Sequence, residues 1–149
     1  MSLSFEEVNI LGNIINDTWG KGSTNYDDDQ FESRYGGSSL KNQGANNSVV
    51  TKASLSGDVL CITAVGIYNL GPISHQHQVI SKAENELNQF VDKKLKMIKD
   101  DFKKKENAGR ALKSSEIKDK KRSLEIQDLN HYAETRPSYI YRRAYFKVE

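Results

Sequence analysis

The pair of residues that comes nearest to a metal site is His75 and His77, two positions apart. Two imidazoles at this spacing can chelate an ion from an extended segment, but protein zinc sites use three or four ligands and supporting hydrogen bonds. His131 is the only other histidine, and no pattern of carboxylates accompanies the pair. We therefore predict no metal site, and we interpret the two histidines as loop residues at the start of a helix.

The acidic run Asp27, Asp28 and Asp29, followed by Glu32, is a second candidate for cation binding. Calcium loops place their ligands at alternate positions and close with a bidentate glutamate, and this run has neither feature. It is more typical of a solvated acidic segment.

The sequence also lacks the parts of a catalytic centre. It contains no glycine-rich phosphate loop, no dinucleotide fingerprint and no nucleophile elbow. Its one cysteine, Cys61, lies in an apolar run and is typical of a buried structural residue. We therefore predict a protein that is not an enzyme and that needs no cofactor.

Aromatic and basic side chains near the C-terminus are the best candidates for binding. Residues 138–148 alternate in polarity, so one face of a strand carries Tyr139, Tyr141, Arg143 and Tyr145. Tyr and Arg are enriched at protein–protein hot spots. Aromatic and basic groups interleaved on a sheet also bind single-stranded nucleic acid. Protein contact is the favoured interpretation, and nucleic-acid binding or an ordinary exposed strand are the alternatives.

The preceding segment, from His75 to about Glu106, predicts one long amphipathic helix. Its apolar residues recur at helical spacing, and Ser81 with Glu84 offers an internal start. The predicted solvent side of the helix carries Lys93, Lys96, Lys99 and Lys103. These lysines would form the basic surface of the helix if it bound nucleic acid. The apolar stripe comprises Ile80, Ala83, Leu87, Phe90, Val91, Leu95, Ile98 and Phe102.

The other elements surround this helix in sequence. A short helix is predicted over 4–16, with Ser4 and Glu7 as a capping box, and strands over 49–55 and 59–68 around a turn at 56–58. Residues 111–119 are ambiguous, a strand containing Leu124 and Ile126 reaches about Leu129, and a last strand spans 138–148. This order predicts an α+β fold, with an antiparallel sheet of about four strands packed on one side by the long helix.

Residues 21–47 form a polar arm rich in Gly, Ser, Asn and Asp. A tract of this composition buries too little apolar surface to offset its conformational entropy, so its ordering must come from the body of the fold or from a neighbouring subunit. Tyr26, Phe31 and Tyr35 are its predicted anchors. We divide the single domain into an N-terminal helix at 1–20, the arm at 21–47 and an α+β body at 48–149.

The charge is unevenly distributed along the chain. Residues 1–89 carry 5 basic and 10 acidic side chains, a net of −5, whereas residues 90–149 carry 17 and 10, a net of +7. Such a chain is suited to contacts between the acidic part of one copy and the basic part of another. The N-terminus does not resemble a signal peptide, and the apolar stretch at 59–68 is about half a membrane span. We expect a soluble protein, made in the cytoplasm, without a membrane partner.

The order of elements from Val49 to Val148, together with the arm, resembles the completion and connector proteins of tailed-phage virions. Tail-terminator, neck and baseplate subunits are of this kind. The resemblance implies a non-enzymatic subunit of a ring or collar, with copies of itself or other subunits as partners, incorporated into a virion. It lies in element order alone, so it assigns no functional residue. The alternative is a nucleic-acid-binding module that uses the basic helix and the Tyr/Arg face.

Overall fold

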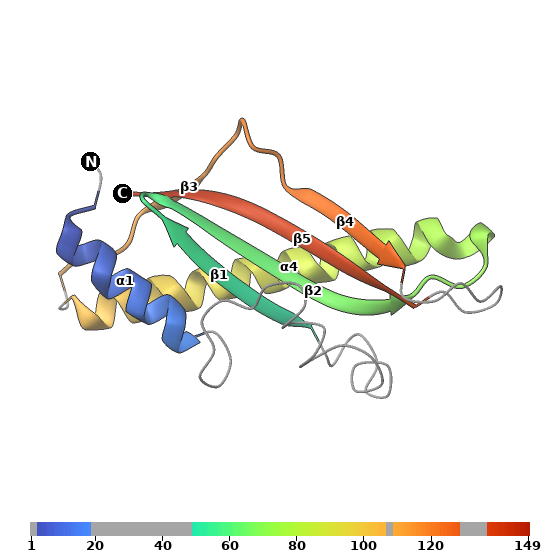
Figure 1. Cartoon of the computed structure of the whole chain (residues 1–149), viewed down its shortest axis with the longest axis horizontal. Coiled ribbons are helices and arrows are strands. Elements are labelled where there is room, and N and C mark those ends of the chain that lie inside the picture. The colour runs from blue at the N-terminus through green and yellow to red at the C-terminus, as the bar shows by residue number, and fades with distance from the viewer. Residues whose placement is uncertain (1–2, 19–48, 107–108, 129–136) are drawn as a thin grey trace.

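A computed structural model describes residues 3–18, 49–106, 109–128 and 137–149. Within these ranges the chain forms an antiparallel sheet packed against one long helix, with a short helix at the N-terminus (Figure 1). The α+β prediction is therefore confirmed. The elements in chain order are α1 (Phe5–Thr18), β1 (Val50–Ser56), β2 (Val59–Asn69), α4 (Ile73–Lys105), β3 (Ser114–Glu116), β4 (Ser123–Asp128) and β5 (Pro137–Val148).

Among the described residues the sheet has five strands, whereas the sequence predicted about four. Strands β1, β2 and β5 are neighbours in that order, and both β3 and β4 pair with the remaining edge of β5. Ser114 lies opposite Val148 in β3, and Ser123 lies opposite Arg143 in β4. The two short strands are thus successive pieces of one sheet edge, interrupted by residues 117–122.

The hairpin of β1 and β2 forms at the turn that the sequence predicted. Ser56 pairs with Val59, and Gly57 adopts a positive φ of 59°, which a glycine accepts without steric cost. β2 continues to Asn69, and Gly71 and Pro72 then separate it from α4.

Helix α4 begins at Ile73, directly after Pro72, and runs without interruption to Lys105. His75 and His77 therefore lie in its first turns and not in a preceding loop, and the predicted internal start at Ser81 is not used. The apolar stripe is confirmed, but Ile80, Phe90 and Leu95 are only partly buried. The charged residue Lys94 is buried in the same row. The buried residues are Ala83, Leu87, Val91, Lys94, Ile98 and Phe102.

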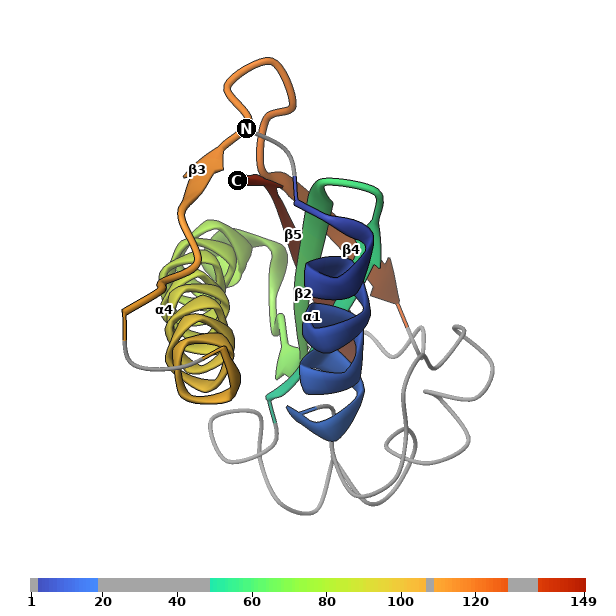
Figure 2. The ribbon, with the colours of Figure 1, turned by 90° about the vertical axis from the view of Figure 1, so that its left-hand side faces the viewer.

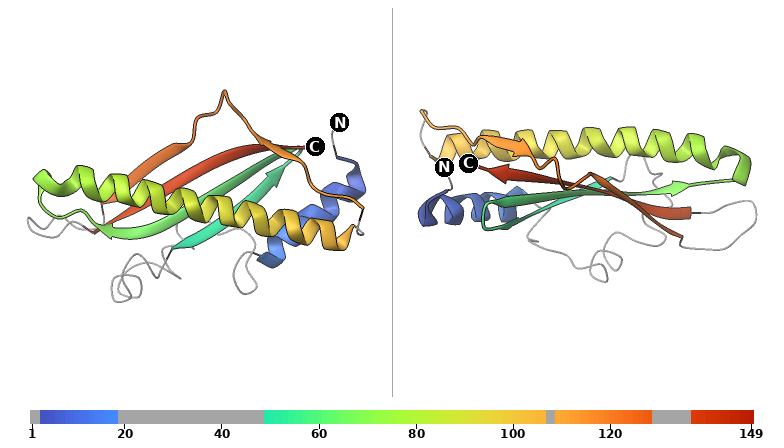
Figure 3. Two further views of the ribbon diagram at one scale, coloured as in Figure 1. Left: turned by 180° about the vertical axis from the view of Figure 1, so that it is seen from behind. Right: turned by 90° about the horizontal axis from the view of Figure 1, so that it is seen from above.

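The main core lies between α4 and one face of the sheet. This face carries buried Leu60 and Ile62 on β2 and Ala144 on β5. Seen from above, α4 follows this side along most of the sheet (Figure 3). At one end of the sheet, α1 packs beside α4 and β1 (Figure 2) and buries Leu11 and Ile14 in the same core.

A polar contact also joins α4 to β2. The Tyr68 hydroxyl donates a hydrogen bond to Glu86 Oε1 at 2.8 Å. Burial, together with this contact to a carboxylate, raises the pKa of Tyr68 well above its ordinary value, so the hydroxyl remains a donor. Of the described helices, none is both long enough and apolar enough to cross a bilayer.

Candidate interaction surfaces

Tyr139 and Tyr141, two of the predicted interface residues, lie on the sheet face opposite α4. Their exposed fractions are only 1% and 8%. The predicted exposure of the Tyr/Arg face is therefore wrong at these two positions. Alternation along a strand determines which side chains share a face, but it does not show whether that face is covered.

The other two predicted residues of β5, Arg143 and Tyr145, are half-buried. Arg143 Nη1 lies 2.6 Å from Glu125 Oε1 on β4, and its guanidinium lies 5.6 Å from the centre of the Tyr141 ring. Their role in an interface stays a prediction. Tyr26, Phe31 and Tyr35, the predicted arm anchors, lie outside the described residues.

The sheet edge between β3 and β4 forms a projection that the sequence did not predict. Residues 117–122, which we name the edge loop, connect the two strands, whereas β5 spans the same interval with Ala144 and Tyr145 alone. The surplus residues extend away from the edge of the sheet, as Figure 1 shows. The Ile117 amide donates a hydrogen bond to the Tyr145 carbonyl at 2.9 Å, which fixes the start of the loop.

Arg122 fixes the other end of the edge loop. Its Nε and Nη2 donate to the two carboxylate oxygens of Glu116 at 2.7 and 3.1 Å. Nη1 donates to Asn88 Oδ1 at 2.9 Å, and Nη2 also reaches Asp92 Oδ1 at 3.1 Å. The side chain is 19% exposed. Bidentate pairing of arginine with a carboxylate gives a defined geometry, so the loop is held against α4.

Arg142 adds a second connection to the same part of α4. Its Nε donates to Asn88 Oδ1 at 2.9 Å, and its Nη1 lies 3.2 Å from Glu84 Oε1. Glu84, Asn88 and Asp92 recur every fourth residue and therefore share one side of the helix. The Asn88 side-chain oxygen thus accepts hydrogen bonds from both arginines, one on β5 and one in the edge loop.

Replacing Arg122 by alanine should lower the free energy of unfolding by about 1.5 kcal/mol, because several charge-assisted hydrogen bonds of a partly exposed group are lost together. Urea unfolding would measure this. The matched control is Lys121→Ala, at the exposed neighbouring position, for which we expect a change within about 0.5 kcal/mol. Equal effects of the two substitutions would show that Arg122 does not anchor the loop.

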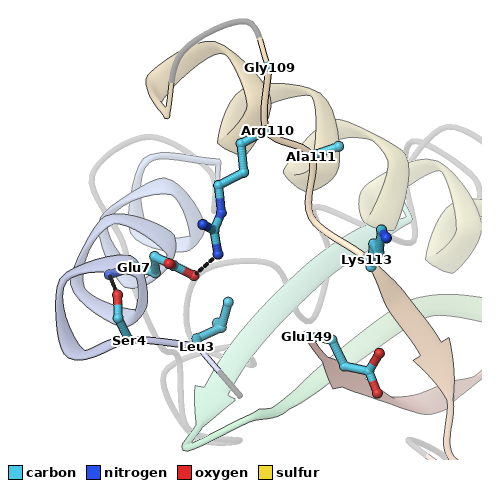
Figure 4. Close-up of a pocket in the computed structure, with 8 residues that line it drawn as sticks. All are labelled: Leu3, Ser4, Glu7, Gly109, Arg110, Ala111, Lys113 and Glu149. Carbon is cyan, nitrogen blue, oxygen red and sulfur yellow. Dashed lines mark hydrogen bonds and ion pairs between the residues drawn. The ribbon is translucent and has the colours of Figure 1, made fainter. Parts of the chain in front are cut away.

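A crevice of about 790 Å³ lies where α1, the segment after α4 and the end of β5 meet (Figure 4). The Ser4 hydroxyl accepts a hydrogen bond from the Glu7 amide at 3.2 Å, which confirms Ser4 as the cap of α1. Glu7 Oε2 lies 2.6 Å from Arg110 Nη2. Lys113 and Glu149 contribute one further charge of each sign. The crevice thus has mixed charge.

The described part of the chain contains no group of three or more His, Cys, Asp or Glu side chains that could hold a metal ion. His75 and His77 are exposed, and His131 and the acidic run Asp27–Asp29 lie outside the described residues. The chain matches no family model, no curated protein and no solved structure. A function must therefore be argued from the surfaces of the molecule.

Proposed function

We propose that the protein is a non-enzymatic structural subunit that assembles with copies of itself, as a connector, tail or baseplate component of a phage virion. The observation that carries the assembly proposal is the edge loop. Lys118, Lys120 and Lys121 project from it, all exposed, while Arg122 and Ile117 hold its two ends. An exposed loop held in place by a rigid scaffold is suited to recognition.

The virion part of the proposal is supported by the resemblance in element order. A helix, a hairpin, a long helix and a second set of paired strands follow one another in the chain, and this is the order on which the resemblance rests. Each copy also combines an acidic N-terminal part with a basic C-terminal part. Such a subunit can make head-to-tail contacts, which close into rings when the rotation between copies allows it.

The nucleic-acid alternative is less well supported by the positions of its residues. It requires the basic side of α4 and the Tyr/Arg face of β5 to act together, but α4 and that face lie on opposite sides of the sheet (Figure 3). Buried Tyr139 and Tyr141 have little ring surface left on which a base could stack. We therefore prefer assembly.

The mass of the native particle tests the proposal most directly. We expect light scattering and sedimentation at low salt to give multiples of the 16.9 kDa chain that grow with concentration. Added salt should shift the distribution towards the monomer, because screening weakens contacts between exposed charges. A monomer at every concentration and ionic strength would contradict self-assembly.

A further inference from the structure

The edge loop also indicates which part of a neighbouring copy it would contact. We propose that it binds the acidic segment Asp27–Glu32 of a second copy of this chain. The inference rests on the proposed function, since it names the contact that joins the copies. The segment lies outside the described residues, and its chemistry is taken from the sequence alone.

The edge loop supplies a compact group of cations. Lys118, Lys120 and Lys121 fall within four consecutive positions, and all are exposed. The ammonium of Lys120 lies 5.0 Å from the centre of the Tyr145 ring, which favours one position for that side chain. The loop encloses an open hollow of about 450 Å³, lined by Ser115, Glu116, Ile117, Lys118, Lys120, Lys121 and Arg122.

The edge loop is held at both ends by contacts within one copy of the chain. Arg122 is held by Glu116, Asn88 and Asp92, and the Ile117 amide by the Tyr145 carbonyl. Because both ends of the loop are anchored, binding has less of the loop to restrain, and more of the electrostatic attraction appears as affinity. The same anchoring neutralises Glu116, whose carboxylate would otherwise oppose an acidic ligand.

A short acidic peptide suits this surface better than a nucleic acid. A phosphate backbone needs cations along an extended track, whereas Asp119 interrupts the lysines, and Arg143, further along β5, is already paired with Glu125. The segment 27–32 carries four carboxylates within six residues and so offers a compact opposite charge. A loop on one copy and a segment on the next form a heterologous contact.

Charge reversal tests the contact. In one variant Lys118, Lys120 and Lys121 become glutamate, and in the other Asp27, Asp28 and Asp29 become lysine. Each should weaken self-association in sedimentation by at least about tenfold, because like charges then face each other. Mixing the two variants gives each loop a segment of opposite charge, so association should recover. The matched control reverses three exposed lysines on α4, with the same change in net charge: Lys96, Lys103 and Lys104.

The possible outcomes separate this inference from the proposed function. If the loop variant associates as well as the α4 control while the wild type still assembles, the assembly stands and this contact is overturned. If only the loop variant fails and the segment variant assembles normally, the acidic segment is not the partner. A loss of binding to a labelled oligothymidylate in that same loop variant would then assign the loop to nucleic acid. A wild type that never assembles overturns both proposals.

Discussion

Replacement of Lys94 by methionine is expected to stabilise the protein at about pH 7, although it removes a charge from a highly charged helix. Lys94 is only 4% exposed and lies in the buried row of α4. Burial lowers its pKa from 10.5 to about 8, against a smaller opposing effect of Asp101. A methionine has similar length and no charge to desolvate. Lys94 lines a small hollow together with Phe90 and Met97, which would give the methionine apolar neighbours.

The sign of the pH dependence follows from the lowered pKa. Below about pH 8 the amine is charged in both states, so the folded protein bears the net cost of burying the charged amine, up to about 3 kcal/mol. Between about pH 8 and 10.5 the unfolded chain retains the proton more readily, and stability therefore rises with pH. The methionine variant has no amine at this position, so its stability lacks this rise with pH.

Urea unfolding of both proteins between about pH 7 and pH 10.5 would measure the difference, which should shrink as the pH rises. Lys93→Met is the matched control, since Lys93 is the exposed neighbour on the same helix. If the difference between wild type and Lys94→Met stays constant with pH, the burial of a charged amine is not its cause.

Leu87→Ala should lower the free energy of unfolding by about 3 kcal/mol. Leu87 is fully buried near the middle of α4, in the core that this helix forms with the sheet. Its truncation removes apolar contacts and leaves a cavity that the sheet and helix can only partly close. Chemical unfolding, monitored by the circular dichroism of the helix, would give the value.

The control for this substitution is Gln89→Ala, two positions further along the same helix and exposed. Alanine is a slightly better helix former, so we expect a change within about 0.5 kcal/mol. A loss below about 1 kcal/mol for Leu87→Ala would mean that α4 does not provide the central layer of the fold.

The sequence predicted the elements with strong local signals. The helical spacing of Leu87, Val91, Ile98 and Phe102 predicted α4, and the turn at Gly57 predicted the first hairpin. The short strand β3 was left ambiguous because Ser114–Glu116 has no strand pattern of its own. Its backbone is extended because it pairs with the end of β5, and that tertiary contact cannot be read from three residues.

The candidate surface was predicted less well, for a related reason. The basic residues at positions 118 and 120–122 are visible in the sequence, but nothing local distinguishes an anchored loop from a solvated one. The anchors of Arg122 lie 34 and 30 positions away, at Asn88 and Asp92. Conversely, the alternation around Tyr139 identified a shared face correctly, but it carried no information about burial on that face.

The shared oxygen of Asn88 has a mechanical consequence. This oxygen accepts hydrogen bonds from Arg122 of the edge loop and from Arg142 of β5. A force on the edge loop therefore acts on the middle of α4, which in turn is bonded to the interior strand β5. Moving the edge loop away from the body would therefore require the hydrogen bonds of Arg122 to Glu116, Asn88 and Asp92 to break together.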